Sequence, residues 1–197
     1  MGIADCRMKL VAGLGNPGAE YEWTRHNLGF EVLDGVAAKH RASWSGKPDA
    51  EIARWAGHAI LLKPQTFMNL SGSAVQRWTH FYKVAVEDLL VVVDDVNLEA
   101  GRVRIRRGGG PGGHNGLKSI IAALGTEDFP RLRIGVGGGA QRNLSSHVLG
   151  KFGAEEEAVI DAAIQKAVEA IEVFVADGIV AAMDRYNRKD DKKTEDN

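Results

Sequence analysis

The stretch LLVVVDD, residues 89–95, is the clearest fold signal in this sequence of 197 residues. Its five apolar residues are of the kind found in strands that are buried on both faces, and the run stops at the acidic pair Asp94 and Asp95. A strand without an alternating polar face needs a covering layer on each side of the sheet. We therefore expect residues 89–93 to form a central strand of an α/β sheet.

A strand–loop–helix unit lies near the start of the sequence. Residues 8–14, MKLVAGL, predict a buried strand that stops at the glycine- and proline-containing loop 15–18. From Leu28 onward the apolar residues fall at helical spacing, and this pattern stops near His40. The loop is therefore expected to end in an amphipathic helix.

The remaining patterns extend the same architecture. Alternation around Gly57 predicts a hairpin, further strands are expected at 102–107 and 131–137, and helices are expected at 71–82, 155–176 and 180–186. Strands that alternate with helices predict a single α/β domain over residues 1–187, with a mixed, mostly parallel central sheet flanked by helices. Residues 188–197 carry no apolar side chain, so we expect a disordered polar tail.

The charge of the chain is balanced overall but uneven along it. The formal net charge of −1 gives no global argument for a nucleic-acid or membrane partner. Residues 101–150, however, hold eight basic and two acidic side chains, together with 13 of the 24 glycines. The single cysteine, Cys6, excludes an intrachain disulfide, and no apolar run approaches the roughly 20 residues that cross a bilayer. A cytoplasmic protein is expected, with no membrane partner.

Two glycine-rich segments are similar to nucleotide-binding motifs but differ from them in context. Gly13, Gly15 and Gly18 satisfy GxGxxG after a strand, yet Pro17 and a polar loop stand where the fingerprint opens a helix. The segment RGGGPGGHNGLKS lacks the adjacent Gly-Lys of a P-loop, because Leu117 intervenes. A dinucleotide-dependent enzyme remains an alternative that this context disfavours.

Several loops carry polar residues that can share one crevice. They are Asn16, His26, Asn27, Asn69, Asp94, His114 and Asn115. Asn16 and Asp94 follow predicted strands, where open α/β sheets form their ligand crevice. The sequence has no serine in a nucleophile elbow and no cluster with zinc-ligand spacing, which leaves water as the nucleophile and histidine as its base. The reaction class predicted by this set is acyl-ester hydrolysis without a metal.

Five motifs in order carry a resemblance to a known family. They are GLGNPGAEYEWTRHNLGF, KPQTFMNLSG, VVVDDVNLEAG, GGGPGGHNGLKS and DFPRLRIGVG. Together they resemble the successive motifs of bacterial-type peptidyl-tRNA hydrolase, from about Lys9 to Val136. The resemblance implies a monomer without metal or organic cofactor. Such an enzyme cleaves the ester between a peptide, or an N-blocked aminoacyl group, and the terminal adenosine of tRNA.

The resemblance also implies roles for individual residues. The residues implied as catalytic are His26 as the base, Asp94 as its supporting carboxylate, and Asn16, which distinguishes blocked from free aminoacyl groups. The residues implied as substrate-binding are Tyr21, Phe67, Asn69, His114 and Asn115. His114 has the alternative of orienting the glycine loop without touching the substrate.

A basic segment is implied as the contact for the tRNA acceptor stem and its 5′ phosphate. Arg104, Arg106 and Arg133 match the positions where the family clamps these phosphates. Backbone contacts of this kind are independent of sequence, which suits an enzyme that accepts many tRNAs. Arginines on an edge strand also keep it soluble and unpaired, which is the structural alternative.

Two further expectations remain open from sequence. A non-catalytic RNA-binding protein with the same basic surface is the alternative from another functional class, and cleavage of a blocked ester distinguishes the two. The segment 138–146, with its glycine, glutamine, asparagine and serine residues, is expected to be a mobile loop near the site.

Overall fold

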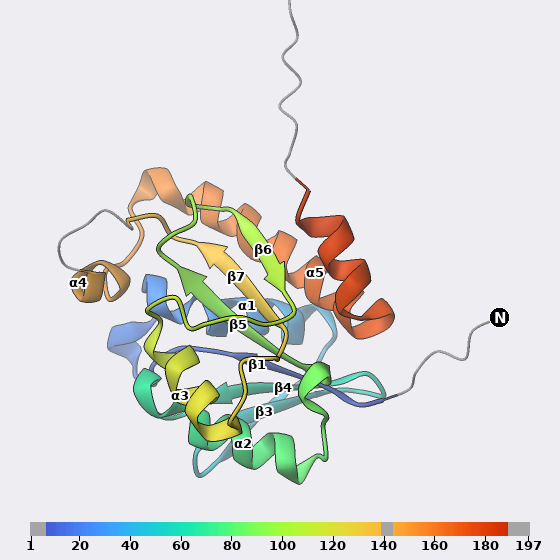
Figure 1. Cartoon of the computed structure of the whole chain (residues 1–197). Coiled ribbons are helices and arrows are strands. Elements are labelled where there is room, and N and C mark those ends of the chain that lie inside the picture. The colour runs from blue at the N-terminus through green and yellow to red at the C-terminus, as the bar shows by residue number, and fades with distance from the viewer. Residues whose placement is uncertain (1–6, 139–143, 189–197) are drawn as a thin grey trace, which may run out of the picture.

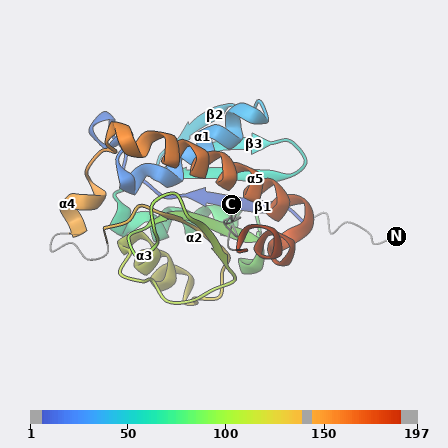
Figure 2. The same cartoon turned by 90° about the horizontal axis from the view of Figure 1, so that it is seen from above.

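A computed structural model describes residues 7–138 and 144–188, which fold into a seven-stranded sheet between two helical layers (Figures 1 and 2). The strands are β1 (Lys9–Gly13), β2 (Trp44–Lys47), β3 (Ala50–Trp55), β4 (Ala59–Pro64), β5 (Leu89–Asp95), β6 (Val103–Arg106) and β7 (Arg131–Gly135). The α-helices are α1 (Leu28–Lys39), α2 (Ser71–Phe81), α3 (Asn115–Leu124), α4 (Leu144–Val148) and α5 (Ala154–Tyr186). Short 3-10 turns are η1 (Ala19–Tyr21), η2 (Arg25–Asn27), η3 (Met68–Leu70) and η4 (Val86–Asp88).

The strand order is β2-β3-β4-β1-β5-β7-β6. The central strands β4, β1, β5 and β7 pair in parallel, whereas β3 and β6 add antiparallel pairs towards the two edges. This arrangement confirms the predicted single α/β domain with a mixed central sheet. The carboxyl ends of the parallel strands meet at one edge, where open α/β folds place their ligands.

Both faces of the sheet are covered. Helices α1 and α5 lie on one face, and α2 and α3 lie on the other (Figure 2). Along β5, Leu90 and Val92 belong to the core under α1 and α5, while Val91 and Val93 belong to the core on the other side. All four are at most 1% exposed. The apolar run therefore forms a doubly covered strand, as predicted.

Close contact between α1 and the sheet depends on two glycines. A Cβ atom on Gly13 would lie 2.2 Å from the carbonyl oxygen of Gly29, and one on Gly29 would lie 2.3 Å from the amide nitrogen of Leu14. Only glycine permits this approach. Because η2 directly precedes α1, the contact places η2 beside the carboxyl ends of β1 and β5.

The structure differs from the sequence-based expectation at several places. Strand β2 and helix α3 were not predicted, and residues 144–146 of the expected loop 138–146 lie in α4. The two predicted C-terminal helices, 155–176 and 180–186, are confirmed: they are the two helical parts of α5, which a kink at the non-helical Gly178, with φ 82°, separates. Residues 139–143 of the predicted loop and 189–197 of the predicted tail lie outside the described residues. No helix in the described ranges is long and apolar enough to cross a membrane.

Candidate functional site

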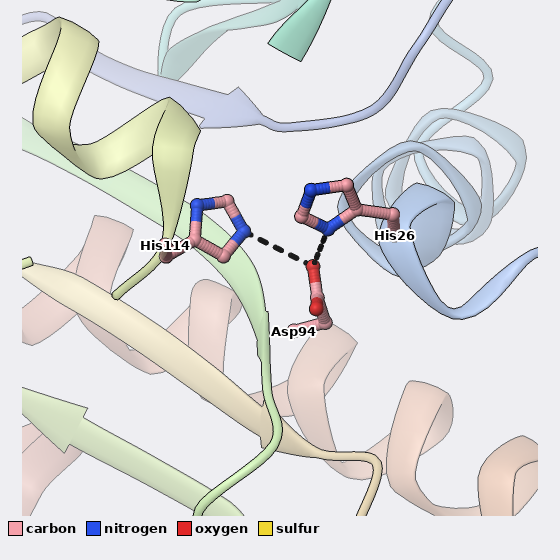
Figure 3. A group of neighbouring side chains, drawn as sticks. All are labelled: His26, Asp94 and His114. Carbon is pink, nitrogen blue, oxygen red and sulfur yellow. Dashed lines mark hydrogen bonds and ion pairs between the residues drawn. The ribbon is translucent and has the colours of Figure 1, made fainter. Parts of the chain in front are cut away.

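Three side chains from separate elements converge at the carboxyl end of β5 (Figure 3). His26 comes from η2, Asp94 from β5, and His114 from the position just before α3. His26 Nδ1 lies 2.8 Å from Asp94 Oδ1, and His114 Nε2 lies 3.1 Å from the same oxygen. The two imidazole rings are 4.8 Å apart between centroids. One carboxylate oxygen thus accepts hydrogen bonds from both histidines.

The hydrogen bonds define the tautomer of each imidazole. His114 Nδ1 accepts from the amides of Gly116 and Leu117 at 3.1 and 3.3 Å, so it carries no proton. The ring is therefore neutral and donates through Nε2–H to Asp94. His26 donates through Nδ1–H, because an ionised carboxylate only accepts. This leaves His26 Nε2 as a free acceptor, the form that a general base requires.

Asp94 is held in its ionised form although it is only 3% exposed. Burial alone would raise its pKa, but the attraction that each imidazole, His114 and then His26, exerts once it is protonated, together with the hydrogen bonds from both rings, holds the pKa of Asp94 well below its usual range. The carboxylate therefore remains charged at neutral pH. A charged, oriented carboxylate beside His26 can stabilise the imidazolium that forms when the ring takes a proton.

Asn16, which follows β1 and lies outside the lining of the cavity described below, is held by a set of amide contacts. Its Oδ1 accepts from the backbone amide of Met68 at 2.8 Å. Its backbone amide donates to Asn27 Oδ1 at 2.9 Å, and Asn27 Nδ2 donates to the Asn16 carbonyl at 3.0 Å. Because Oδ1 is occupied, the side-chain NH₂ of Asn16 is the group that remains available as a donor.

The glycines of the first loop are used for packing. A Cβ on Gly15 would lie 2.8 Å from the ring of Phe30, and one on Gly13 would meet Gly29 and Leu33. Gly18 precedes η1 rather than α1. In a dinucleotide site the second glycine makes room for a pyrophosphate and the third lies at the start of the helix. The described geometry of this loop does not match that arrangement.

A cavity of about 110 Å³ lies beside the three side chains. Its lining includes His26, Asp94, His114, Asn115 and Arg133. A water molecule takes up about 30 Å³ of liquid, so the cavity has room for a water and part of an ester group. Two imidazoles, a carboxylate, an amide and a guanidinium therefore border one small space.

The other predicted substrate residues lie outside the lining of this cavity. Asn69 is exposed and follows Met68, the residue whose amide holds Asn16. Phe67 is 57% exposed, and Tyr21 is half-buried at the end of η1. Helix α3, which begins with Asn115, packs against η3, which contains Asn69. The structure thus brings the two asparagine-bearing elements together, while Phe67 projects into solvent.

The three predicted arginines form a basic strip that starts at the cavity. Arg133 on β7 lines the cavity, lies directly opposite Arg104 on β6, and pairs with Asp95 at 2.7 Å. Arg106 is exposed two residues further along β6. The positive charge of Arg106, with smaller effects of burial, Arg102 and Arg133, lowers the pKa of Arg104. This mutual repulsion makes the strip favourable for a polyanion.

Sequence reasoning left out residues that hold the site together. Asn27, singled out only as a polar loop residue, fixes the backbone of Asn16 with two hydrogen bonds. Arg25 and Asp95 were given no role, yet Arg25 anchors η2 and Asp95 pairs with Arg133. The one available signal was their position next to predicted site residues in the motifs TRHN and VVVDD.

The same three side chains have donor atoms suited to a metal ion. One atom each from His26, Asp94 and His114 lies within 4.8 Å of the others. His26 Nδ1 and His114 Nε2 are already donating to Asp94, however, and the remaining His114 nitrogen accepts from the α3 backbone. A cation at this point would have to replace those hydrogen bonds. The arrangement suits proton transfer better than metal ligation.

Comparison with known proteins gives consistent similarities. A family model described as peptidyl-tRNA hydrolase matches residues 10–195. Peptidyl-tRNA hydrolase of Caldanaerobacter subterraneus subsp. tengcongensis is 50% identical, and the match covers 91% of this chain and 100% of the relative. The protein of the same name from Symbiobacterium thermophilum is 49% identical, covering 91% and 98%. The crystal structure of peptidyl-tRNA hydrolase from Acinetobacter baumannii is 38% identical with a TM-score of 0.87, covering 94% and 97% of the two chains.

Proposed function

This chain belongs to the peptidyl-tRNA hydrolase family, and from that premise we propose that it uses a water activated by His26 to cleave peptidyl-tRNA. The bond broken is the ester between the peptide, or a blocked aminoacyl group, and the terminal adenosine of tRNA. The released tRNA can then be charged again. The observation that carries this mechanism is the contact of 2.8 Å between His26 Nδ1 and Asp94 Oδ1.

His26 is the proposed general base. Its Nδ1–H is bound by Asp94, so Nε2 receives the proton from water as the water oxygen attacks the ester carbon. The imidazolium that results is stabilised by the Asp94 carboxylate. Collapse of the tetrahedral intermediate breaks the ester bond, and His26 returns the proton to the ribose oxygen that leaves. The products are a free carboxylic acid and a tRNA with a free terminal hydroxyl.

The amides are proposed to hold the acyl group and the developing oxyanion. The side-chain NH₂ of Asn16 is a fixed donor because Met68 and Asn27 hold the rest of this residue. A donor fixed before the reaction stabilises a developing negative charge without a cost of reorganisation. Asn69 and Asn115 extend the set of amides on the side of η3 and α3. The exposed Phe67 and the half-buried Tyr21 offer apolar surface to the peptidyl-adenosine end.

The tRNA acceptor stem is proposed to lie along Arg133, Arg104 and Arg106. These side chains lead from the cavity to the edge strand, and guanidinium groups pair well with phosphate. His114 is assigned a positioning role, because both of its nitrogens are engaged in protein hydrogen bonds. We expect the enzyme to act as a monomer in the cytoplasm and without a metal ion.

The test is release of N-acetyl-aminoacyl groups from tRNA in excess chelator. Wild type should cleave the blocked ester and spare unblocked aminoacyl-tRNA, and His26→Ala should lose about 10² to 10⁴ fold in turnover with its fold intact. His80→Ala is the matched control, since His80 is an exposed residue of α2. Turnover by folded His26→Ala at the wild-type rate would remove His26 as the base. Tight tRNA binding without cleavage by wild type would identify an RNA-binding protein instead.

A further inference from the structure

Arg25, the residue next to His26, is a buried arginine with an extensive set of partners. It is only 8% exposed. Its Nη2 donates to both carboxylate oxygens of Glu156 at 2.9 and 2.6 Å, and its Nη1 donates to the carbonyls of Gly150 and Lys151 at 3.2 and 2.7 Å. The guanidinium also lies over the Phe152 ring, 4.8 Å from the centroid. The mechanism above leaves this group without a role.

These contacts join η2 to the chain segment that precedes and begins α5. The Arg25 backbone amide donates to the Gly150 carbonyl at 3.1 Å, and Thr24 forms an isolated antiparallel bridge with Lys151. Glu156 is itself fixed, because its Oε2 accepts from the Gly153 amide at the start of α5. That bond and the Arg25 pair lower the pKa of Glu156, so the partner of Arg25 remains charged. The partner of Arg25 is therefore a side chain that is itself bound to the backbone at the start of α5.

The opposite end of η2 is held in a different way. Asn27 is bound to the backbone of Asn16 at the end of β1. His26 thus lies between two anchored neighbours, Arg25 on the α5 side and Asn27 on the β1 side. Its own ring has Asp94 as its hydrogen-bond partner within the described residues. A three-residue 3-10 turn has little internal rigidity of its own.

We propose that Arg25 is a positioning residue, which sets the orientation of the His26 ring by fixing η2 to the N-terminus of α5 through Glu156. The inference rests on the proposed role of His26 as the base. Without the pair between Arg25 and Glu156, η2 can shift relative to β5, and the Nδ1–H group of His26 then loses its alignment with Asp94. A displacement of about 1 Å at a reacting group is enough to reduce a rate about 100-fold.

The exposed ion pair Lys39–Glu172 provides a matched control. This pair joins α1 to α5 at the C-terminal end of α1, which is the end away from η2, with Lys39 Nζ 2.9 Å from the carboxylate. If Arg25 only held α5 in place, weakening either the Arg25–Glu156 pair or the Lys39–Glu172 pair would lower the free energy of unfolding and leave the reaction unchanged. If Arg25 orients His26, only the Arg25 link would affect the reaction.

The experiment uses three test variants: Arg25→Lys, Glu156→Gln and the double variant that combines these two substitutions. The control variant is Lys39→Gln. Lysine keeps the charge of Arg25 but has one nitrogen in place of the two that bind Glu156 and the Gly150 and Lys151 carbonyls. Glutamine keeps the size of Glu156 but offers one acceptor oxygen instead of two. The readouts are kcat and KM on N-acetyl-aminoacyl-tRNA, unfolding in urea, and the downfield proton NMR signal of the His26 Nδ1–H group.

We expect Arg25→Lys and Glu156→Gln each to lower kcat about 10- to 100-fold with little change in KM, and to weaken or broaden the Nδ1–H signal. The double variant should be no worse than the poorer single variant, because both act through one contact. Lys39→Gln should leave kcat and the signal unchanged. Folded Arg25→Lys and Glu156→Gln proteins with wild-type kcat and an intact signal would overturn the inference. His26→Ala is measured beside them: its inactivity assigns such a result to Arg25 alone, whereas its full activity refutes the proposed function and the inference together.

Discussion

Replacing Asp94 by asparagine removes one negative charge from the site with almost no change in size. The amide oxygen of asparagine can still accept from both imidazole N–H groups, so the bonds at 2.8 and 3.1 Å have a partner in the variant. What the variant lacks is a counter-charge for the imidazolium that forms as His26 takes the proton. Two unit charges about 4 Å apart interact by about 4 kcal/mol at an effective dielectric constant of about 20. Since about 1.4 kcal/mol of barrier corresponds to tenfold in rate, kcat should fall about 10³ fold.

The assay is hydrolysis of N-acetyl-aminoacyl-tRNA under saturating and limiting substrate, which separates kcat from KM. KM should change little, because Asp94 acts through His26. Asp34→Asn is the control: it removes a carboxylate of the same size on α1, which pairs with Lys63 of β4 rather than with a site histidine. A folded Asp94→Asn enzyme within tenfold of the wild-type kcat would refute the view that this carboxylate stabilises a charged His26.

The same substitution gives a pH dependence of stability. The folded-state pKa of Asp94 is depressed below its ordinary value, so its ionised form stabilises the fold at pH above about 4. That contribution is lost as the pH falls from about 4 towards the folded-state pKa. The stability difference between wild type and Asp94→Asn, measured by urea unfolding, should therefore shrink as the pH falls below about 4. A difference that grows on acidification contradicts the assigned sign.

Two further predictions concern tRNA contact and packing. Arg106→Ala should raise KM for every tRNA tested and reduce the slope of log K against log salt by about one, as measured by binding titrations between 50 and 200 mM salt; a loss confined to one tRNA sequence is incompatible with backbone contact. Gly29→Ala should destabilise the fold by roughly 1–3 kcal/mol or more in urea unfolding, because its Cβ would lie 2.3 Å from the Leu14 amide. Gly46→Ala is its control, with no atom within 4 Å of the added carbon, and should stay within roughly 0.5 kcal/mol of wild type.

The sequence predicted most elements with a clear hydrophobic period. The runs at 89–93 and 8–14 form the adjacent central strands β5 and β1, and the arginine-alternating segment forms the edge strand β6. Strand β2 was missed because WSGK has little apolar character and forms a largely exposed edge strand. Helix α3 was missed because its start lies in a glycine-rich segment and His114, rather than a serine or aspartate, caps it.

The residue types of the site could be inferred from sequence, but their bonding could not. Motif order identified His26, Asp94 and the asparagines as candidates. The sharing of one Asp94 oxygen by two histidines depends on the start of α3, an element that was not predicted. In the same way, the Asn16–Asn27 pair depends on the approach of α1 to β1 that Gly13 and Gly29 allow. Tertiary contacts of this kind leave no periodic signal in a single sequence.

Asn187, just after α5, closes the edge of the sheet. Its side-chain amide accepts from the Ile105 N–H at 2.8 Å and donates to the Ile105 carbonyl at 2.9 Å, as a neighbouring strand would. An edge strand with free backbone groups is a template for intermolecular pairing and aggregation. The Asn187 amide therefore satisfies the backbone groups of Ile105, so that β6 offers fewer free groups to another strand. A C-terminal affinity tag should therefore begin beyond residue 188. A chain shortened to end before Asn187 would lose this contact and should be less soluble.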